Sequence, residues 1–374
     1  MKFCSRDWGQ SDKIRVKTMK KILFVTGGLG RGGAQRVISL LADEYVKAGW
    51  TVHMAMLLEN KVGYQINPEI VLHDLVRKGS YAKNVVGWLR DLRKLMQVEH
   101  PNVVLAFVGR INILTMLASC GLGIPIAVSE RNDPAHDRRS SLEIKLCRYF
   151  YGKADLVVFQ TNYQKAFYGK RCEHNGVIIG NPIAADIYDG EHPNKDIISV
   201  GKLMSQKNHP MLIRAFAKIA DQYPEKRVHI FGSGGLKTEL QSLIDQLGMN
   251  GRIILEGNSD RMIELLREYQ YFVMTSDYEG LSNALLEAMM SGMTCISTAW
   301  GGVEDVIIDG VNGYLVPVGD VDELSRKITM VMEHDHTATD QEGIATAAAY
   351  KTERIIQKWF GALDKIISLN GEQL

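Results

Sequence analysis

The chain has 374 residues, of which 45% are hydrophobic and 23% are charged. That composition is typical of a folded globular protein and excludes an extensively disordered one. The length exceeds what one ordinary α/β core needs, and it predicts two domains of comparable size. The five cysteines lie far apart without a C-x-x-C pair, so the sequence indicates neither a zinc site nor a disulfide framework and favours a reducing cytoplasm.

The net charge is only +1, but it is distributed unevenly along the chain. Residues 1–180 hold 27 Lys and Arg against 15 Asp and Glu, a net charge of +12, and residues 181–374 hold 17 against 28, a net charge of −11. A basic half indicates an anionic partner, such as membrane headgroups, a lipid pyrophosphate or nucleic acid. The alternative is a solvated basic surface without such a partner.

The first half of the chain predicts one doubly wound α/β domain. Residues 1–18 mix both charges without an apolar core, so they do not resemble a signal peptide and are expected to form a loose leader. From residue 19, Val/Ile/Leu-rich runs alternate with helical patterns, which predicts a parallel sheet covered on both faces. The expected strands are 21–26, 52–58, 103–107, 124–129, 156–160 and 177–180, and the expected helices include 33–48 and 84–98.

An uncharged run of 18 residues, 111–128, is close to the length of a membrane span. Gly121, Gly123 and Pro125 interrupt it. The sequence therefore predicts a buried helix over 111–120, a turn and a buried strand over 124–128.

The alternation restarts after a polar link near 182–195, which predicts a second domain of the same kind. The expected strands are 196–201, 227–232, 252–257, 271–276 and 294–298, and the expected helices are 209–222, 236–247, 260–269, 281–291 and 321–333. The last segment, 350–367, is an amphipathic helix by its pattern, with Ile355, Ile356, Trp359, Leu363 and Ile366 on one face.

The first strand is followed by a glycine-rich loop. Gly28, Gly30 and Gly33 spell G-x-G-x-x-G, the pattern of a dinucleotide-binding loop. A dehydrogenase would also use an acidic ribose ligand after the second strand, and Glu59 is available there. The loop alone therefore leaves open whether it serves a dinucleotide or another phosphate-bearing ligand.

Two stretches after strands of the second domain have the composition of a phosphate site. Lys202 and Lys207 lie between a strand and a helix, where two ammonium groups can clamp a diphosphate or be merely solvated. Gly232 and Gly234 follow the next strand, where the backbone can approach a ligand closely or form a tight turn.

The pair Glu279 and Glu287 is the strongest pattern. The sequence predicts that Glu279 stands at the start of a helix and that Glu287 follows slightly over two turns later. Both side chains can then point from one side of that helix toward a cleft between the two domains. The alternative is a capping acid and a solvated helix residue. The first turn offers N–H groups that can hold a phosphate, and it comprises Gly280, Leu281, Ser282 and Asn283.

Asp320 and Asp322 form a D-x-D triplet, but its place before a helix favours N-capping over metal binding.

In combination these residues resemble a glycosyltransferase of the GT-B fold, in the large retaining family 4. The E-x7-E hallmark of that family matches Glu279 and Glu287, and its basic diphosphate pair matches Lys202 and Lys207. Its glycine-rich first loop with G-G-A-x-R matches Gly32 to Arg36.

The resemblance implies an α/β architecture of two doubly wound, Rossmann-like domains that face a central cleft. Residues 19–185 would form the acceptor-binding domain, and residues 186–350 would form the nucleotide-sugar-binding domain. The resemblance also implies that the helix 351–370 crosses back to the first domain.

The resemblance assigns a role to each site residue. Glu279 would bind hydroxyls of the donor sugar and stabilise the positive charge that develops on the sugar ring, and Glu287 would bind the nucleotide ribose. Lys202 and Lys207 would neutralise the leaving diphosphate, so that no metal and no cofactor are expected. The wider donor site comprises Gly280, Leu281, Ser282, Asn283, Gly232, Gly234 and Asn258, and the acceptor and phosphate loop comprises Gly30, Gly32, Gly33, Arg36 and Glu130.

The chain departs from the family pattern in two places. Lys202 stands where many relatives have Arg. The lysine keeps the positive charge, but it cannot form the two parallel hydrogen bonds that a guanidinium group makes to a phosphate. Arg131 stands where relatives often carry a histidine near the donor sugar, and it is taken here as the fourth catalytic residue. The run from Glu130 to Asp133 resembles a subset that adds amino sugars to growing saccharides.

Two basic amphipathic stretches bear on the acceptor. Residues 138–153 combine Arg138, Arg139, Lys145, Arg148 and Lys153 with apolar side chains, and residues 87–96 are similar. They predict docking to the cytoplasmic face of a membrane, where a polyprenyl pyrophosphate-linked saccharide is reached. The alternative is that both are ordinary helices that pack an apolar face on the sheet.

The expected function is the retaining transfer of a hexose or an N-acetylhexosamine from a UDP-sugar to a saccharide acceptor in bacterial surface polysaccharide assembly, without a nucleic-acid partner. A UDP-sugar epimerase, an NAD(P)-dependent dehydrogenase that uses the first glycine-rich loop, and a non-catalytic saccharide-binding protein are the alternatives.

Overall fold

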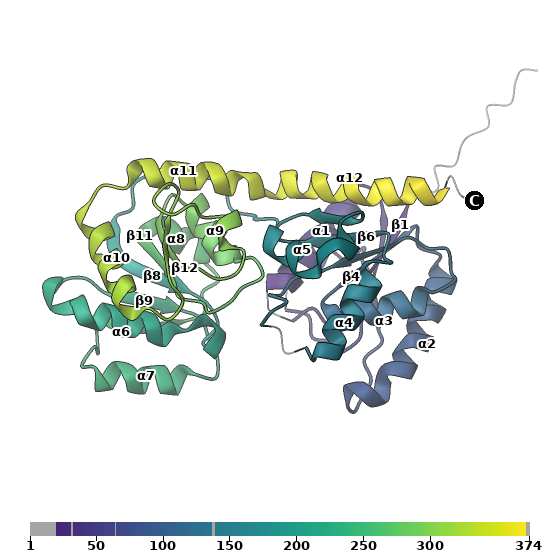
Figure 1. Cartoon of the computed structure of the whole chain (residues 1–374), viewed down its shortest axis with the longest axis horizontal. Helices are drawn as coiled ribbons and strands as arrows, with labels where there is room; N and C mark the ends of the chain where they lie inside the picture. Colours follow the sequence, from purple (N-terminus) through teal and green to yellow (C-terminus); the bar gives the residue numbers. More distant parts are fainter. Residues whose placement is uncertain (1–19, 31–32, 64, 137–138, 372–374) are drawn as a thin grey trace, which may run out of the picture.

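The computed structural model describes residues 20–371 except 31–32, 64 and 137–138. The expected leader 1–18, Gly32 and Arg138 lie outside these residues. Two parallel sheets form the cores of two α/β domains, as predicted. Figure 1 shows the domains side by side.

The first sheet has the strand order β3-β2-β1-β4-β5-β6-β7, and all its pairs are parallel. Its central strands are apolar runs buried on both faces, which is why they read as continuous rather than alternating patterns. The strands are β1 (Lys21–Thr26), β2 (Thr51–Met56), β3 (Val71–Asp74), β4 (Val103–Phe107), β5 (Ile126–Ser129), β6 (Leu156–Phe159) and β7 (Gly176–Ile178).

Helices cover both faces of this sheet. The helices are α1 (Gly33–Lys47), α2 (Tyr81–Glu99), α3 (Gly109–Ser119), α4 (Ser141–Tyr151) and α5 (Asn162–Tyr168). α1 packs on one face, and α2, α3, α4 and α5 pack on the other. The uncharged run is a buried helix and a buried strand, as predicted. In the described part of the chain, no helix has both the length and the apolar character that a membrane crossing needs.

The second sheet has the strand order β10-β9-β8-β11-β12-β13 and is also parallel. The strands are β8 (Asn194–Val200), β9 (Val228–Phe231), β10 (Ile253–Gly257), β11 (Tyr269–Met274), β12 (Thr294–Thr298) and β13 (Tyr314–Val316). The helices are α6 (His209–Ile219), α7 (Lys237–Gln246), α8 (Met262–Glu268), α9 (Asn283–Met290), α10 (Val321–Glu333) and α11 (Thr337–Ala347).

Asp320 caps α10 through the N–H of Glu323 at 2.9 Å, so its predicted capping role is confirmed.

The last helix, α12 (Thr352–Gly371), belongs to the core of the first domain although it follows the second domain in the sequence. Figure 1 shows it running from the second domain along the first. Five apolar side chains of α12 are buried on the same face of the first sheet as α1, namely Ile355, Ile356, Trp359, Leu363 and Ile366.

The strand order reverses direction at the same place in both sheets. In the first sheet β1 lies between β2 and β4, and in the second β8 lies between β9 and β11. Ligands of such sheets bind at the carboxyl ends of the strands beside this switch point. The loops after β1, β4, β8 and β11 are therefore the segments in which a site is expected.

Candidate active site

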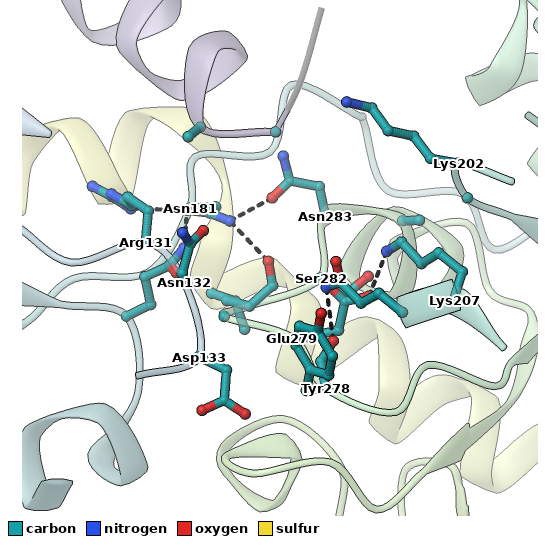
Figure 2. A pocket seen from close by; sticks show the side chains of 18 of the residues that line it. Arg131, Asn132, Asp133, Asn181, Lys202, Lys207, Tyr278, Glu279, Ser282 and Asn283 are labelled. Atoms are coloured by element: carbon teal, nitrogen blue, oxygen red, sulfur yellow. Dashed lines mark hydrogen bonds and ion pairs between the residues drawn. The ribbon is translucent and has the colours of Figure 1, made fainter. Parts of the chain in front are cut away.

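A cavity of about 710 Å³ lies between the two domains, within the size range of small-molecule sites. Its walls come from the N-terminus of α1 and the loops after β4, β5 and β6 in the first domain, and from the loops after β8 and β11 in the second. Predicted residues on these walls are Gly33, Arg131, Lys202, Lys207, Glu279, Gly280, Leu281, Ser282 and Asn283. Figure 2 shows the cavity from close by.

The carboxylate of Glu279 is the polar centre of the second-domain wall. It forms an ion pair with Lys207, and Ser276 Oγ donates to Glu279 Oε1 at 2.7 Å. Gln206 Nε2 donates to Glu279 Oε2 at 3.5 Å and to the carbonyl of Tyr278 at 2.8 Å. The loop after β8 therefore holds the loop after β11 in place through charged and polar contacts.

The predicted placement of Glu279 on a helix is wrong. α9 begins at Asn283, Ser282 is its N-cap, and Glu279 lies in the preceding loop. The loop runs close to the first domain at Gly280, where a Cβ would lie 2.3 Å from the carbonyl oxygen of Arg131. That approach between two domains, rather than a helical turn, positions Glu279 at the cavity.

Glu287 does not line the cavity. It lies in the second turn of α9, is 5% exposed, and accepts from Arg36 Nη1 at 2.5 Å. Burial raises the pKa of Glu287, and the charge of Arg36 opposes that shift. The structure thus joins two residues to which the family resemblance assigned different roles, Arg36 in the acceptor and phosphate loop and Glu287 at the ribose.

Gly28 and Gly30 make room for Glu59 rather than for a ligand. A Cβ at Gly28 would lie 2.2 Å from Cγ of Glu59, and one at Gly30 would lie 2.8 Å from its Oε1. A dinucleotide pyrophosphate at this loop would face the Glu59 carboxylate, which disfavours the dinucleotide interpretation. Neither glycine lines the cavity, whereas Gly33 does because it opens α1.

Lys202 and Lys207 differ in their surroundings although both line the cavity. Lys207 is engaged by Glu279, whereas the side chain of Lys202 is exposed and is drawn apart from Glu279 in Figure 2. The two ammonium groups reach the cavity from one short loop, so both can approach one anionic ligand.

Gly232 and Gly234 pack against the loop after β8, which carries Lys202, and they do not line the cavity. A Cβ at Gly232 would lie 1.9 Å from the carbonyl oxygen of Gly201, and one at Gly234 would lie 2.2 Å from that of Leu203. The predicted close approach is real, but it is an approach to protein backbone.

Asn258 is exposed outside the cavity and donates to Ser233 Oγ at 3.0 Å, and its assignment to the donor site stays a prediction.

Glu130 is fully buried behind the cavity wall and does not line it, so its contact with the acceptor stays a prediction. Its Oε2 accepts from Arg139 Nη1 at 2.9 Å, Tyr151 Oη at 3.1 Å and Tyr168 Oη at 2.5 Å. Its Oε1 accepts from the backbone N–H of Arg131 at 3.2 Å. The carboxylate therefore holds the loop after β5 against the domain core.

The guanidinium of Arg131 also points into the first domain. It lies over the rings of Phe107 and Trp359, 5.3 and 5.4 Å from their centroids, and Nη1 donates to Asn181 Oδ1 at 2.9 Å. Burial lowers the pKa of Arg131 to about 9, against the charge of Glu130. Figure 2 shows this group pointing away from Glu279, and the catalytic role of Arg131 stays a prediction.

Several cavity residues were missed by the sequence analysis. Asn181 Nδ2 donates to the carbonyl of Leu281 at 3.1 Å and to Asn283 Oδ1 at 2.5 Å, which ties the domains together at the cavity. Asp133, His136 and Gln160 follow β5 and β6 on the other side. Their place after parallel strands was the available signal, because the carboxyl ends of those strands share one edge of the sheet.

One described group of side chains, in the first domain, has a composition that can hold a metal ion: His53, His73 and Glu99. The imidazoles contact each other at 2.9 Å between His53 Nδ1 and His73 Nε2, and Glu99 Oε2 accepts from Lys21 Nζ at 2.9 Å. None of these residues lines the cavity.

Comparisons with known proteins agree with this architecture. A family model for glycosyltransferase family 4 matches residues 31–186, and a model for glycosyl transferases group 1 matches residues 186–348. The N-acetylgalactosamine-N,N'-diacetylbacillosaminyl-diphospho-undecaprenol 4-alpha-N-acetylgalactosaminyltransferase of Campylobacter jejuni is 25% identical over 339 residues, which cover 85% of this chain and 91% of that protein.

A second Campylobacter jejuni relative is the GalNAc-alpha-(1->4)-GalNAc-alpha-(1->3)-diNAcBac-PP-undecaprenol alpha-1,4-N-acetyl-D-galactosaminyltransferase, 23% identical over 85% of this chain and 90% of that protein. The crystal structure of Anabaena Alr3699/HepE in complex with UDP has the same fold, with a TM-score of 0.76 at 18% identity over 92% of this chain and 100% of that one. The chain belongs to the glycosyltransferases of family 4, with the GT-B fold.

Proposed function

We propose that this glycosyltransferase moves an N-acetylhexosamine or a hexose from a UDP-sugar to a saccharide carried on a polyprenyl diphosphate, with retention of anomeric configuration, in bacterial surface polysaccharide assembly. The pairing of Glu279 with Lys207 in the interdomain cavity carries the proposal. The Campylobacter relatives, whose names specify diphospho-undecaprenol saccharides, and the UDP complex of the Anabaena structure support it.

In the proposed reaction, the bond between the anomeric carbon and the UDP oxygen breaks, and its electron pair leaves with the diphosphate. Lys207 and Lys202 then face a growing negative charge, and their ammonium groups stabilise it. The carboxylate of Glu279 stabilises the positive charge that develops on the sugar ring. The acceptor attacks from the face that UDP leaves, which retains the configuration.

No metal is part of this proposal, because two ammonium groups on one loop supply the positive charge that a leaving diphosphate requires. Lys207 is already oriented by Glu279, so a donor that binds there meets a preorganised cation. Glu287 binds the ribose in this proposal only if its ion pair with Arg36 opens.

A thermal unfolding panel tests the donor assignment. UDP, GDP, ADP, NAD and the matching sugar conjugates are added to the parent and to Lys207→Ala, Glu287→Ala and the surface control Lys218→Ala. A ligand that binds the native state raises the melting temperature. We expect UDP or a UDP-sugar to stabilise the parent and the control, and to lose that effect in Lys207→Ala.

The alternatives give different results in the same panel. Stabilisation by NAD alone, unchanged in Lys207→Ala, would support a dehydrogenase. Conversion of a UDP-sugar to its epimer without any acceptor would support an epimerase, and UDP binding without turnover would support a binding protein.

We also propose that the enzyme acts at the cytoplasmic face of the membrane and docks there through α4. Three apolar side chains of α4 are exposed, namely Leu142 at 65%, Leu146 at 37% and Tyr149 at 47%. Lys145 and Lys153 are exposed beside them, which suits an anionic lipid surface. The other predicted stretch, 87–96, instead buries Trp88, Leu92 and Met96 on the sheet, so the packing alternative holds there.

A further inference from the structure

The cavity contains an imidazole–carboxylate pair that the reaction described so far does not use. His136 Nδ1 lies 2.8 Å from Asp133 Oδ2, and both residues line the cavity from the loop after β5. The Asp133 side chain is fully buried, whereas the His136 side chain is 55% exposed. The pair therefore has a buried anchor and an imidazole that opens to the cavity.

The partners of Asp133 fix which nitrogen of His136 carries the proton. The carboxylate accepts from the backbone N–H of Ala135 at 2.8 Å, and it also receives a hydrogen bond from Tyr163. An ionised carboxylate can only accept, so His136 Nδ1 is the donor, and in the neutral imidazole this leaves the lone pair on Nε2. Within the described part of the chain, Nε2 has no hydrogen-bond partner.

The imidazole lies at the contact between the two domains. Its ring stacks on the ring of Tyr278 with a centroid distance of 5.1 Å and an interplanar angle of 12°. Tyr278 belongs to the second domain and directly precedes Glu279. His136 is therefore a first-domain base placed beside the residue to which the proposed function assigns the donor sugar.

We infer that His136, oriented by Asp133, binds the attacking hydroxyl of the acceptor saccharide and accepts its proton. This inference rests on the proposed function. The O–H electron pair forms the new bond to the anomeric carbon, the proton moves to Nε2, and the old bond breaks toward the UDP oxygen. The imidazolium is stabilised by Asp133 and returns the proton to water after UDP leaves.

The test distinguishes a catalytic role of His136 from a structural one, because added imidazole can replace a missing base. UDP-N-acetylgalactosamine and UDP-N-acetylglucosamine serve as donors, and citronellyl diphosphate carrying one N-acetylhexosamine serves as the acceptor. The variants are His136→Ala and Asp133→Asn, and His174→Ala is the matched control because that histidine is exposed and lies outside the cavity.

We expect His136→Ala to lower kcat by about 10²- to 10⁴-fold, the usual contribution of a general base. Free imidazole is expected to restore at least a tenfold part of the loss, because it can enter the space of the missing ring. Asp133→Asn is expected to give a smaller loss that imidazole does not restore. His174→Ala is expected to stay within about threefold of the parent.

The inference is overturned if His136→Ala keeps kcat within about threefold of the parent, or if its loss is unaffected by imidazole while UDP still stabilises it. Failure of the proposed function looks different, since neither parent nor variants would then be stabilised by UDP. For that case, 15N-histidine NMR of the full chain gives an independent readout. The acceptor alone should perturb the Nε2 resonance that disappears in His136→Ala, and no such perturbation would overturn the inference.

Discussion

Arg36 and Glu287 are 251 positions apart in the sequence and form an ion pair of 2.5 Å between the two domains. Arg36 comes from α1 and Glu287 from α9, the helices whose N-termini meet at the cavity. Because Glu287 is buried and Arg36 is part-exposed, the pair closes one side of the domain interface and keeps a charged carboxylate inside it.

Replacing Arg36 by Ala should destabilise the protein most at neutral pH. Burial raises the pKa of Glu287 above its ordinary 4.5, and Arg36 limits the rise. The folded state thus holds the proton more tightly than the unfolded state, and the unfolding free energy falls as the pH rises above 4.5. We expect Arg36→Ala to cost about 1–3 kcal/mol at pH 7 and progressively less toward pH 4.5.

Urea unfolding at a series of pH values measures this effect, and Arg326→Ala is the control because its pair with Glu323 is exposed. The control should change the unfolding free energy by less than about 0.5 kcal/mol at every pH. A loss in Arg36→Ala that is independent of pH would contradict the explanation.

Glu279→Gln should separate donor binding from catalysis. The amide is close in size to the carboxylate and can still accept from Ser276, but it cannot stabilise positive charge on the sugar ring. We expect UDP to raise the melting temperature as in the parent, while kcat for sugar transfer falls about 10²- to 10³-fold. Equal transfer rates in the variant and the parent would remove Glu279 from the mechanism.

Glu130→Gln should damage the fold rather than the acceptor site. The carboxylate is fully buried and receives hydrogen bonds from Arg139, Tyr151 and Tyr168. Removing its charge from a buried ion pair is expected to cost about 3–5 kcal/mol in unfolding free energy. The KM for the acceptor, measured below the lowered melting temperature, should stay unchanged, and a selective rise in that KM would restore the acceptor role.

The exposed face of α4 should control attachment to anionic liposomes. We expect Leu142→Glu combined with Leu146→Glu to move the protein to the soluble fraction in a flotation assay at low salt. Leu247→Glu combined with Leu369→Glu is the matched control, since those leucines are exposed at 38% and 52% away from α4, at the end of α7 and in α12. Docking through α4 is excluded if the parent itself fails to float.

Asp340→Asn should stabilise the protein above neutral pH. Burial raises the pKa of Asp340 from 3.8 to about 7, and its hydrogen bond from Thr294 only partly opposes the shift. The unfolding free energy therefore falls as the pH rises from 3.8 to 7. At pH 8 the asparagine variant should gain about 1–4 kcal/mol over the parent, and at pH 4 the two should agree within error.

The interior strands of both sheets were predictable because they are buried on both faces, whereas the edge strands β3 and β13 were not predicted. Each interior strand is a continuous apolar run, as in Phe24, Leu105 and Phe272, and no tertiary information is needed to recognise it. Several helices were predictable for a related reason, since one apolar face is buried on a sheet, as with Trp88 and Leu92 in α2.

The site was less predictable because contacts between the domains decide it. The loop of Glu279 resembles the start of a helix, but Gly280 approaches the carbonyl of Arg131, and the helix begins three residues later. Sequence also does not distinguish a buried acid such as Glu130 from one at a cavity. His136 was missed because its role depends on Asp133 and Tyr278, and Tyr278 belongs to the other domain.

The position of α12 has a consequence for how the chain is synthesised. Trp359 and Leu363 complete the core of the first domain, yet they follow all of the second domain in the sequence. During translation, one apolar face of the first sheet therefore stays without this cover until the second domain has left the ribosome. Exposed apolar surface is prone to aggregation, so this domain order lengthens the time for which the nascent chain exposes that face.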